Sequence, residues 1–152
     1  MGTKRIGHAR IRSLINKNQN QLQTRYQKVV TTSDAAKTLT AADSGALVIL
    51  AQATASRVLT LPSVAAGLTF EICAGADGDA GSGAWVITPS DTDTLDGVVI
   101  GRTGTGVVIN AADTLTADAT IKMGDRVLLS CDGTTWFTTA LVNDAGDWTV
   151  AG

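Results

Sequence analysis

Few residues in this chain could carry out acid–base or nucleophilic chemistry. Its one histidine, His8, lies in a basic N-terminal segment. A Ser-His-Asp or Cys-His site would need that imidazole within hydrogen-bond reach of a hydroxyl or a thiol. The one glutamate, Glu71, falls on a strand-like stretch, on the face opposite Phe70 and Ile72, where a solvated or ion-paired carboxylate is expected. We assign no catalytic residue and expect a protein that is not an enzyme.

The cysteines and aspartates do not form a metal-binding signature either. Cys73 and Cys131 are far apart in the sequence and have no neighbouring Cys or His, unlike the ligands of a zinc site. We expect both thiols to be buried and reduced, with a bridge between them as the alternative. Asp91, Asp93 and Asp96 have the spacing of a calcium loop, but the run lacks its fixed glycine and closing glutamate, which favours turn-forming aspartates. We expect no cofactor, and folding without metal or disulfide.

Composition favours an all-β protein. The 152 residues include 22 Thr and 16 Gly, and only 17% are charged, below the roughly 25% of an ordinary soluble domain. Thr, Val, Asp and Gly suit strands and turns, whereas helix-rich proteins rely on Glu, Lys and Leu. No run approaches the roughly 18 consecutive apolar residues of a membrane span, so no membrane partner is expected.

Short strand-like runs fill residues 34–152, which we interpret as the body. Several of them alternate apolar and polar side chains, at intervals of roughly ten residues, a pattern typical of an antiparallel β-sandwich or barrel-like body. Trp85, Trp136 and Phe137 are expected in its core. The predicted strands are Leu47–Leu50, Arg57–Leu61, Leu68–Cys73, Trp85–Thr88, Gly97–Ile100, Val107–Ile109, Thr120–Lys122, Arg126–Cys131, Trp136–Leu141 and Trp148–Val150.

Turn residues support this pattern. Asp132-Gly133 lies between two good strands and predicts a tight hairpin, and Gly101–Gly106 predicts a looser one. The small residues of Ala74–Gly83 indicate an exposed loop. A Gly-x-x-Val-Ile motif recurs at Gly45 and Gly83, but its spacings are uneven, which indicates repeated strand chemistry rather than a solenoid.

Charge divides the chain into two parts. Residues 1–28 contain seven basic residues and no acidic one, whereas residues from 34 onward contain five basic and fourteen acidic residues. We interpret residues 1–33 as a basic arm, because such asymmetry usually marks a segment with its own partner. Several apolar residues, with Val29 the last, fall roughly on one helical face, but so thin a stripe is marginal alone and would order against a partner.

A protein-docking arm is the favoured interpretation. A solvated, disordered terminus is the alternative, and a nucleic-acid arm is unlikely because the acidic body would repel the same polyanion. A membrane anchor is not expected, since no Trp or Phe lies on the stripe. The residues expected to bind the partner are Arg5, Arg10, Ile11, Arg12, Leu14, Ile15, Leu22 and Tyr26.

The body also carries an ordered set of short motifs, which cover about residues 38–140. They are Thr38–Gly45 (TLTAADSG), Val58–Pro62 (VLTLP), Ala65–Phe70 (AAGLTF), Gly124–Leu129 (GDRVLL) and Ser130–Phe137 (SCDGTTWF). This order resembles a family of small β-rich structural proteins of tailed bacteriophages. The basic start, Lys4–Arg12, resembles the N-termini of some phage head proteins.

The resemblance implies a virion structural protein with no catalytic residue. Its first implication is a capsid decoration, or cement, protein on the capsid surface, made in the host cytoplasm. The implied partners are the major capsid protein and neighbouring copies of itself, with a trimer as the first expectation. Tail, fibre or adaptor components share the motifs and are the alternative, and a carbohydrate-binding module is the second alternative.

Overall fold

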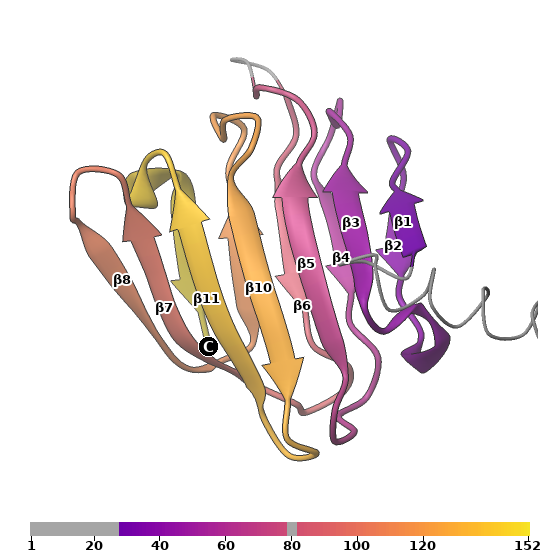
Figure 1. Ribbon diagram of the computed structural model, residues 1–152. Coiled ribbons are helices and arrows are strands. Elements are labelled where there is room, and N and C mark those ends of the chain that lie inside the picture. The colour runs from indigo at the N-terminus through magenta and orange to yellow at the C-terminus, as the bar shows by residue number, and fades with distance from the viewer. Residues whose placement is uncertain (1–27, 79–81) are drawn as a thin grey trace, which may run out of the picture.

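Two β-sheets pack face to face around one hydrophobic core in the computed structural model, which describes residues 28–78 and 82–152 (Figure 1). The expected all-β fold is confirmed. The strands are β1 (Lys28–Thr31), β2 (Lys37–Thr38), β3 (Ala46–Leu50), β4 (Arg57–Thr60), β5 (Thr69–Ala74), β6 (Trp85–Thr88), β7 (Leu95–Gly101), β8 (Gly106–Ala112), β9 (Thr114–Ala117), β10 (Arg126–Cys131), β11 (Trp136–Val142) and β12 (Trp148–Ala151). Two short 3-10 turns are η1 (Ala41–Asp43) and η2 (Ala145–Asp147).

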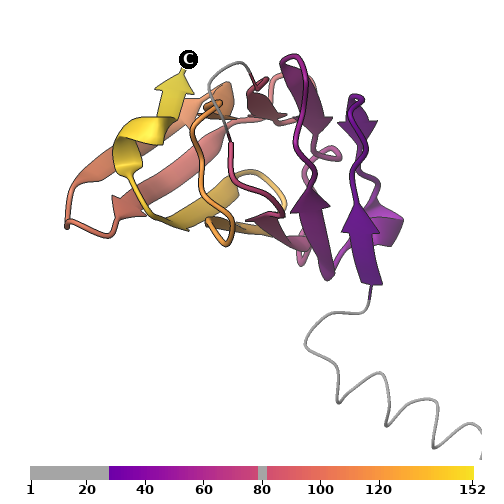
Figure 2. The ribbon, with the colours of Figure 1, turned by 90° about the horizontal axis from the view of Figure 1, so that it is seen from above.

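Both sheets mix parallel and antiparallel pairs, so the expectation of a purely antiparallel body is wrong. The seven-stranded sheet has the order β1-β3-β5-β10-β11-β7-β8, and the five-stranded sheet has the order β12-β9-β6-β4-β2. Figure 2 shows the two layers from above. The parallel pairs are β1 with β3, β3 with β5, β2 with β4, β4 with β6, and β11 with β7.

The first six strands alternate strictly between the two sheets. Odd-numbered strands β1, β3 and β5 stack in parallel in one sheet, and β2, β4 and β6 stack in parallel in the other. The chain therefore winds as three stacked coils of unequal length, since Lys28 pairs with Ala46 and Ala46 pairs with Phe70. Because the coils differ in length, they have no fixed solenoid period. The Gly-x-x-Val-Ile motif is unevenly spaced because Gly45 precedes β3 and Gly83 precedes β6, which lie in different sheets.

Hairpins organise the second half. The predicted Asp132-Gly133 hairpin joins β10 and β11, with Gly133 at φ +108° and the Asp132 carboxylate accepting from the backbone N–H groups of Thr134 and Thr135. The predicted looser hairpin joins β7 and β8. Both predictions are confirmed. Turn residues act locally, so hairpins of this kind can be recognised from the sequence.

Three short strands were not predicted, and one predicted strand is absent from the described fold. β1 and β2 lack the apolar alternation that marks a strand, whereas β9 alternates but is only four residues long. Residues Thr120–Lys122 form a turn, in which the Asp125 carboxylate accepts from Lys122 N at 3.2 Å. β1 also corrects the arm boundary, because residues 28–31, assigned to the arm, pair with β3.

The core is built from residues that alternate with outward-facing ones along each strand. Trp85 and Trp136 are almost fully buried, as predicted, and the Phe70 and Trp136 rings pack with centroids 5.9 Å apart. Phe137 was expected in the core but is 48% exposed. The physical reason is that Trp136 and Phe137 are neighbours on one strand, so their side chains lie on opposite faces of the sheet.

The Thr38–Gly45 motif has a structural role. The Asp43 carboxylate accepts from Thr40 N and Thr40 Oγ1 at 3.0 and 2.9 Å, which closes a capping box around η1. It also forms an ion pair with Lys28, which ties β1 to the body. Ser44 Oγ accepts from Thr69 N at 3.1 Å, and Gly45 has a φ of +78°. The motif therefore fixes a tight connection between β2 and β3.

Candidate functional site

The residues predicted to bind a partner lie outside the described residues. Arg5, Arg10, Ile11, Arg12, Leu14, Ile15, Leu22 and Tyr26 all precede Lys28, where the described chain begins. Their role stays a prediction. What the structure defines is where the arm joins the body, which is β1, at one edge of the seven-stranded sheet.

Glu71 is ion-paired, as the sequence analysis expected. Its side chain is only 5% exposed and forms a salt bridge with Arg126, whose side chain is 46% exposed. The two residues come from adjacent strands, β5 and β10. A nearly buried carboxylate needs such a partner, because burial of an uncompensated charge is costly.

The cysteines are both free and buried. Cys73 stands opposite Arg126, near one end of the β5–β10 ladder, whereas Cys131 donates its backbone N–H to Leu68 at the other end. About five strand positions separate them, roughly 17 Å, far beyond the reach of a disulfide. Burial raises the pKa of the Cys73 thiol.

Each aspartate of the possible calcium loop serves the backbone. Asp93 Oδ2 accepts from Val64 N at 3.0 Å, Asp96 Oδ1 accepts from Ala111 N at 3.0 Å, and Asp91 occupies a turn with φ +50°. Within residues 28–78 and 82–152, no group of three or more His, Cys, Asp or Glu side chains could hold a metal ion. A turn therefore accounts for Asp91, whereas Asp93 and Asp96 each hold a backbone N–H group that is distant in the sequence.

Hydrogen bonds and ion pairs also set the acidities of two other aspartates. The Lys28 ammonium, followed by Thr40, lowers the pKa of Asp43 to about 2. The Arg57 guanidinium, followed by Thr54, lowers the pKa of Asp34 to about 2. Both carboxylates lie in the connections between strands and hold those connections to neighbouring strands.

The most distinctive surface is the side of the seven-stranded sheet that faces away from the core, which we call the outer face. Strand registers align its side chains in rows. One row crosses all seven strands and carries five apolar side chains with one Glu and one Thr among them. In the order of the strands it comprises Val29, Leu47, Glu71, Leu128, Thr139, Val98 and Val108.

A second row beside it is also largely apolar, with Ile49, Leu141 and Ile100 around Arg126. Six of the eight large hydrophobic side chains that are exposed in the described chain lie on the outer face. They are Val29, Ile100, Val108, Leu128, Phe137 and Leu141. Val108 is 74% exposed and Leu141 is 52% exposed. No described helix or strand covers this face (Figures 1 and 2).

The opposite surface of the molecule is different. The outward side chains of the five-stranded sheet are mainly threonines, such as Thr60, Thr88, Thr116 and Thr149, with Val58 as its one large exposed hydrophobic residue among those described. Threonine suits a strand face in water. The two outer surfaces therefore differ in kind, and only the seven-stranded sheet presents an apolar one.

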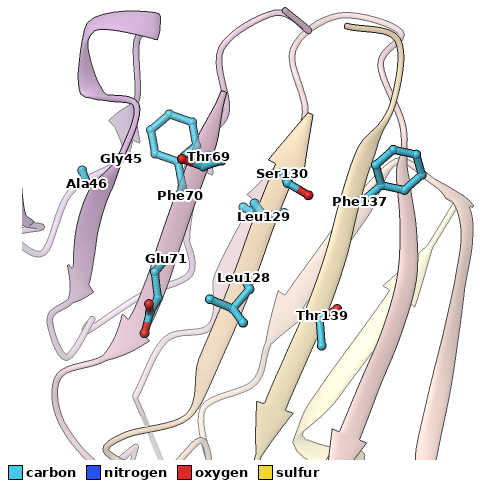
Figure 3. A pocket seen from close by; sticks show the side chains of 10 residues that line it. All are labelled: Gly45, Ala46, Thr69, Phe70, Glu71, Leu128, Leu129, Ser130, Phe137 and Thr139. Atoms are coloured by element: carbon cyan, nitrogen blue, oxygen red, sulfur yellow. The ribbon is translucent and has the colours of Figure 1, made fainter. Parts of the chain in front are cut away.

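A shallow hollow of about 320 Å³ lies within the outer face (Figure 3). Its lining includes the small residues Gly45, Thr69 and Ser130 and the larger Leu128 and Phe137. Figure 3 shows Glu71, Leu128 and Thr139 side by side on β5, β10 and β11. Its lining is part apolar and part hydroxyl, and its one charged residue, Glu71, is paired with Arg126. Such a lining suits contact with a side chain, or with the surface of a strand, that packs against the outer face.

The outer face was not predicted from the sequence, although a signal existed. Val98-Val-Ile100, Val107-Val-Ile109 and Leu128-Leu129 are continuous apolar runs. Such runs indicate strands covered on both faces, whereas alternating runs indicate strands covered on one.

The comparisons with known proteins add no relative: a scan against family models found no match, and neither did a search of curated proteins. No helix in the described part of the chain is long and apolar enough to cross a membrane.

Proposed function

We propose that this protein is a structural component of a tailed bacteriophage virion, a capsid decoration protein that binds the assembled head shell. The proposed role is non-enzymatic. The observation that carries it is the two-part organisation of the chain. A basic arm leads into the edge of a β body, and no described element covers the apolar outer face of that body. Among the described polar groups that could have suggested chemistry, Asp93 and Asp96 accept hydrogen bonds from distant backbone N–H groups, and Glu71 is in an ion pair.

The mechanism is mass action. A protein that binds the assembled shell, and not the free coat protein, stabilises the shell by the free energy of that binding. The arm would engage the major capsid protein, with its apolar side chains as anchors and its positive charges steering the approach. The body would contact neighbouring copies, with a trimer at three-fold positions as the first arrangement to test.

Labelling of purified virions tests this proposal. An antibody raised against the body, detected with colloidal gold in the electron microscope, should decorate heads and not tails. Shells that lack the protein should lose their coat at a lower temperature and regain stability when purified protein is added. Gold confined to tails would establish the tail or fibre alternative, and absence of the protein from purified virions would overturn a virion role altogether.

A further inference from the structure

The outer face has the properties of an interface. It is broad, apolar and uncovered in the described structure, whereas the outer surface of the five-stranded sheet is threonine-rich. Monomeric proteins rarely expose a continuous apolar patch of several hundred Å² without a binding role. Seven strands about 4.8 Å apart, each with two or three outward side chains, cover roughly 500 Å².

We infer that the occupant of this face is a second copy of the same chain, packed outer face to outer face about a two-fold axis, which makes a dimer in place of the trimer that the resemblance implies. The biological purpose of the oligomer rests on the proposed function. Its assembly does not, because assembly is a property of the free protein. A pair of such faces would bury about 1,000 Å² or more in total, the lower limit for a specific interface. Two stacked sheets pack about 10 Å apart with apolar side chains interdigitated, as they do in a sandwich core.

Charge argues for a second copy over the arm as occupant. The charged side chains on the outer face are Glu71, Arg126 and Asp96, and the first two form an ion pair. The six basic residues that precede Lys28 would therefore find little negative charge there. A second copy would bring its own nearly neutral face, so an acidic body could associate at this surface without opposing like charges.

Self-complementarity is the remaining requirement for a closed oligomer. The central row places Leu128 and Thr139 between Glu71 and Val98, and the hollow beside them is lined by Gly45, Thr69 and Ser130. The exposed Phe137 ring at the margin of this hollow gives a second copy a large side chain to insert. Projection and hollow lie on one surface, which is what an interface between identical faces needs.

The test is the mass of the full-length protein in solution, measured by sedimentation velocity and light scattering without shells. Wild-type protein should have twice the 15.6 kDa mass of one chain, because two identical faces that pack on each other join two copies. Thr139→Arg places a charge in the centre of the outer face and should raise the dissociation constant by about 100-fold or more. Thr149→Arg is the matched control, because Thr149 is an exposed strand threonine on the other sheet. It should leave the mass unchanged.

A second pair of variants, Val108→Lys and Val58→Lys, repeats the test at other positions on the two sheets. Circular dichroism must show native strand content in every variant, so that misfolding is not mistaken for dissociation. Val108→Lys should dissociate the oligomer, and Val58→Lys should not. The face variants are Thr139→Arg and Val108→Lys, and the controls are Thr149→Arg and Val58→Lys. The inference would be overturned if the wild type is a monomer, if both face variants keep the wild-type mass, or if the controls dissociate as much as the face variants. Dissociation by Ile11→Ala with Leu14→Ala, with both face variants still assembled, would overturn it in favour of the arm. Shell binding is measured separately, so a monomer that still binds shells would defeat this inference alone.

Discussion

At the centre of the outer face, the Glu71 carboxylate is almost removed from solvent and depends on Arg126. Replacement of Arg126 by Gln should lower the free energy of unfolding by about 1–2 kcal/mol. The loss is smaller than for a fully buried pair, because half of the arginine side chain is hydrated. Urea unfolding measures it.

Arg102→Gln is the control, since Arg102 lies in an exposed turn, and it should change stability by less than about 0.5 kcal/mol. A double variant, Glu71→Gln with Arg126→Gln, should recover part of the loss, because no buried charge is then left without its partner. Equal losses in the Arg126 and Arg102 variants would show that the pair contributes nothing.

Asp43 gives the fold a dependence on acid. Its pKa is lowered to about 2 in the folded protein by Lys28 and Thr40, against an ordinary value of 3.8. A lowered pKa contributes stability that is fully present above about pH 4 and is lost as the pH falls through 2. Solvent screens the half-exposed Lys28, so we expect about 1 kcal/mol from this group.

The measurement is the free energy of unfolding between pH 6 and pH 2 for the wild type and for Asp43→Asn. The variant should be less stable at pH 6, and the difference should shrink toward pH 2. Asp118→Asn, in an exposed turn, is the control. A difference that stays constant over the whole range would mean that Asp43 acts through its hydrogen-bonding shape and not its charge.

Among the elements, β7 depends on one glycine. Gly97 has a φ of +149°, at an irregularity in the β7–β8 register, and a Cβ there would lie 1.8 Å from the Thr138 carbonyl oxygen on β11. Gly97→Ala should therefore cost about 3 kcal/mol or more, since neither backbone can yield without breaking the ladder.

Gly106→Ala, on the neighbouring β8, is the control. Its Cβ would meet no heavy atom closer than 3.3 Å, the Val99 carbonyl oxygen, and its backbone needs no positive φ. It should cost about 1 kcal/mol or less by thermal or urea unfolding. Similar losses in the two variants would contradict the close packing of β7 on β11.

The elements also show what sequence can predict here. Alternation and turn chemistry are local, so β10, β11 and their Asp132-Gly133 hairpin could be predicted closely. The partner of a strand is not a local property, and so the parallel pairing of β3 with β5 was missed. Phe137 was wrongly predicted to be buried, because that prediction used only the type of its side chain. Trp136, its neighbour on the strand, points into the core, so Phe137 lies on the opposite face. The outer face was missed for a similar reason, since its rows exist only once β5, β10 and β11 are side by side.

For the whole molecule, the roles proposed for the arm and for the body can be tested separately. If apolar anchors hold the arm on the coat protein, Ile11→Ala with Leu14→Ala should lower occupancy on DNA-free shells at physiological salt. Burial of one such side chain contributes roughly 1.5–3 kcal/mol, whereas a rim charge pair contributes about 0–1. Arg10→Gln with Arg12→Gln should mainly slow association, and this effect should fade at high salt.

Binding is measured by co-sedimentation with shells and by association kinetics at two salt concentrations. Body variants such as Val58→Lys are the control, because they leave the arm intact. Loss of binding only in the arginine variant, with the alanine variant unaffected, would replace the anchored arm with an electrostatic one.

The alternation of β1–β6 between the two sheets has a consequence for how the chain acquires its fold. No two consecutive strands of this half pair with each other, so none of its ladders can form as a hairpin. β10 and β11, by contrast, form a hairpin. Contacts between residues that are close in sequence form fastest. We therefore expect the last third of the chain to fold first and to present β10 as the template on which β5, then β3, then β1 assemble. β1, the first of the described strands to be synthesised, would then be the last of them to pair.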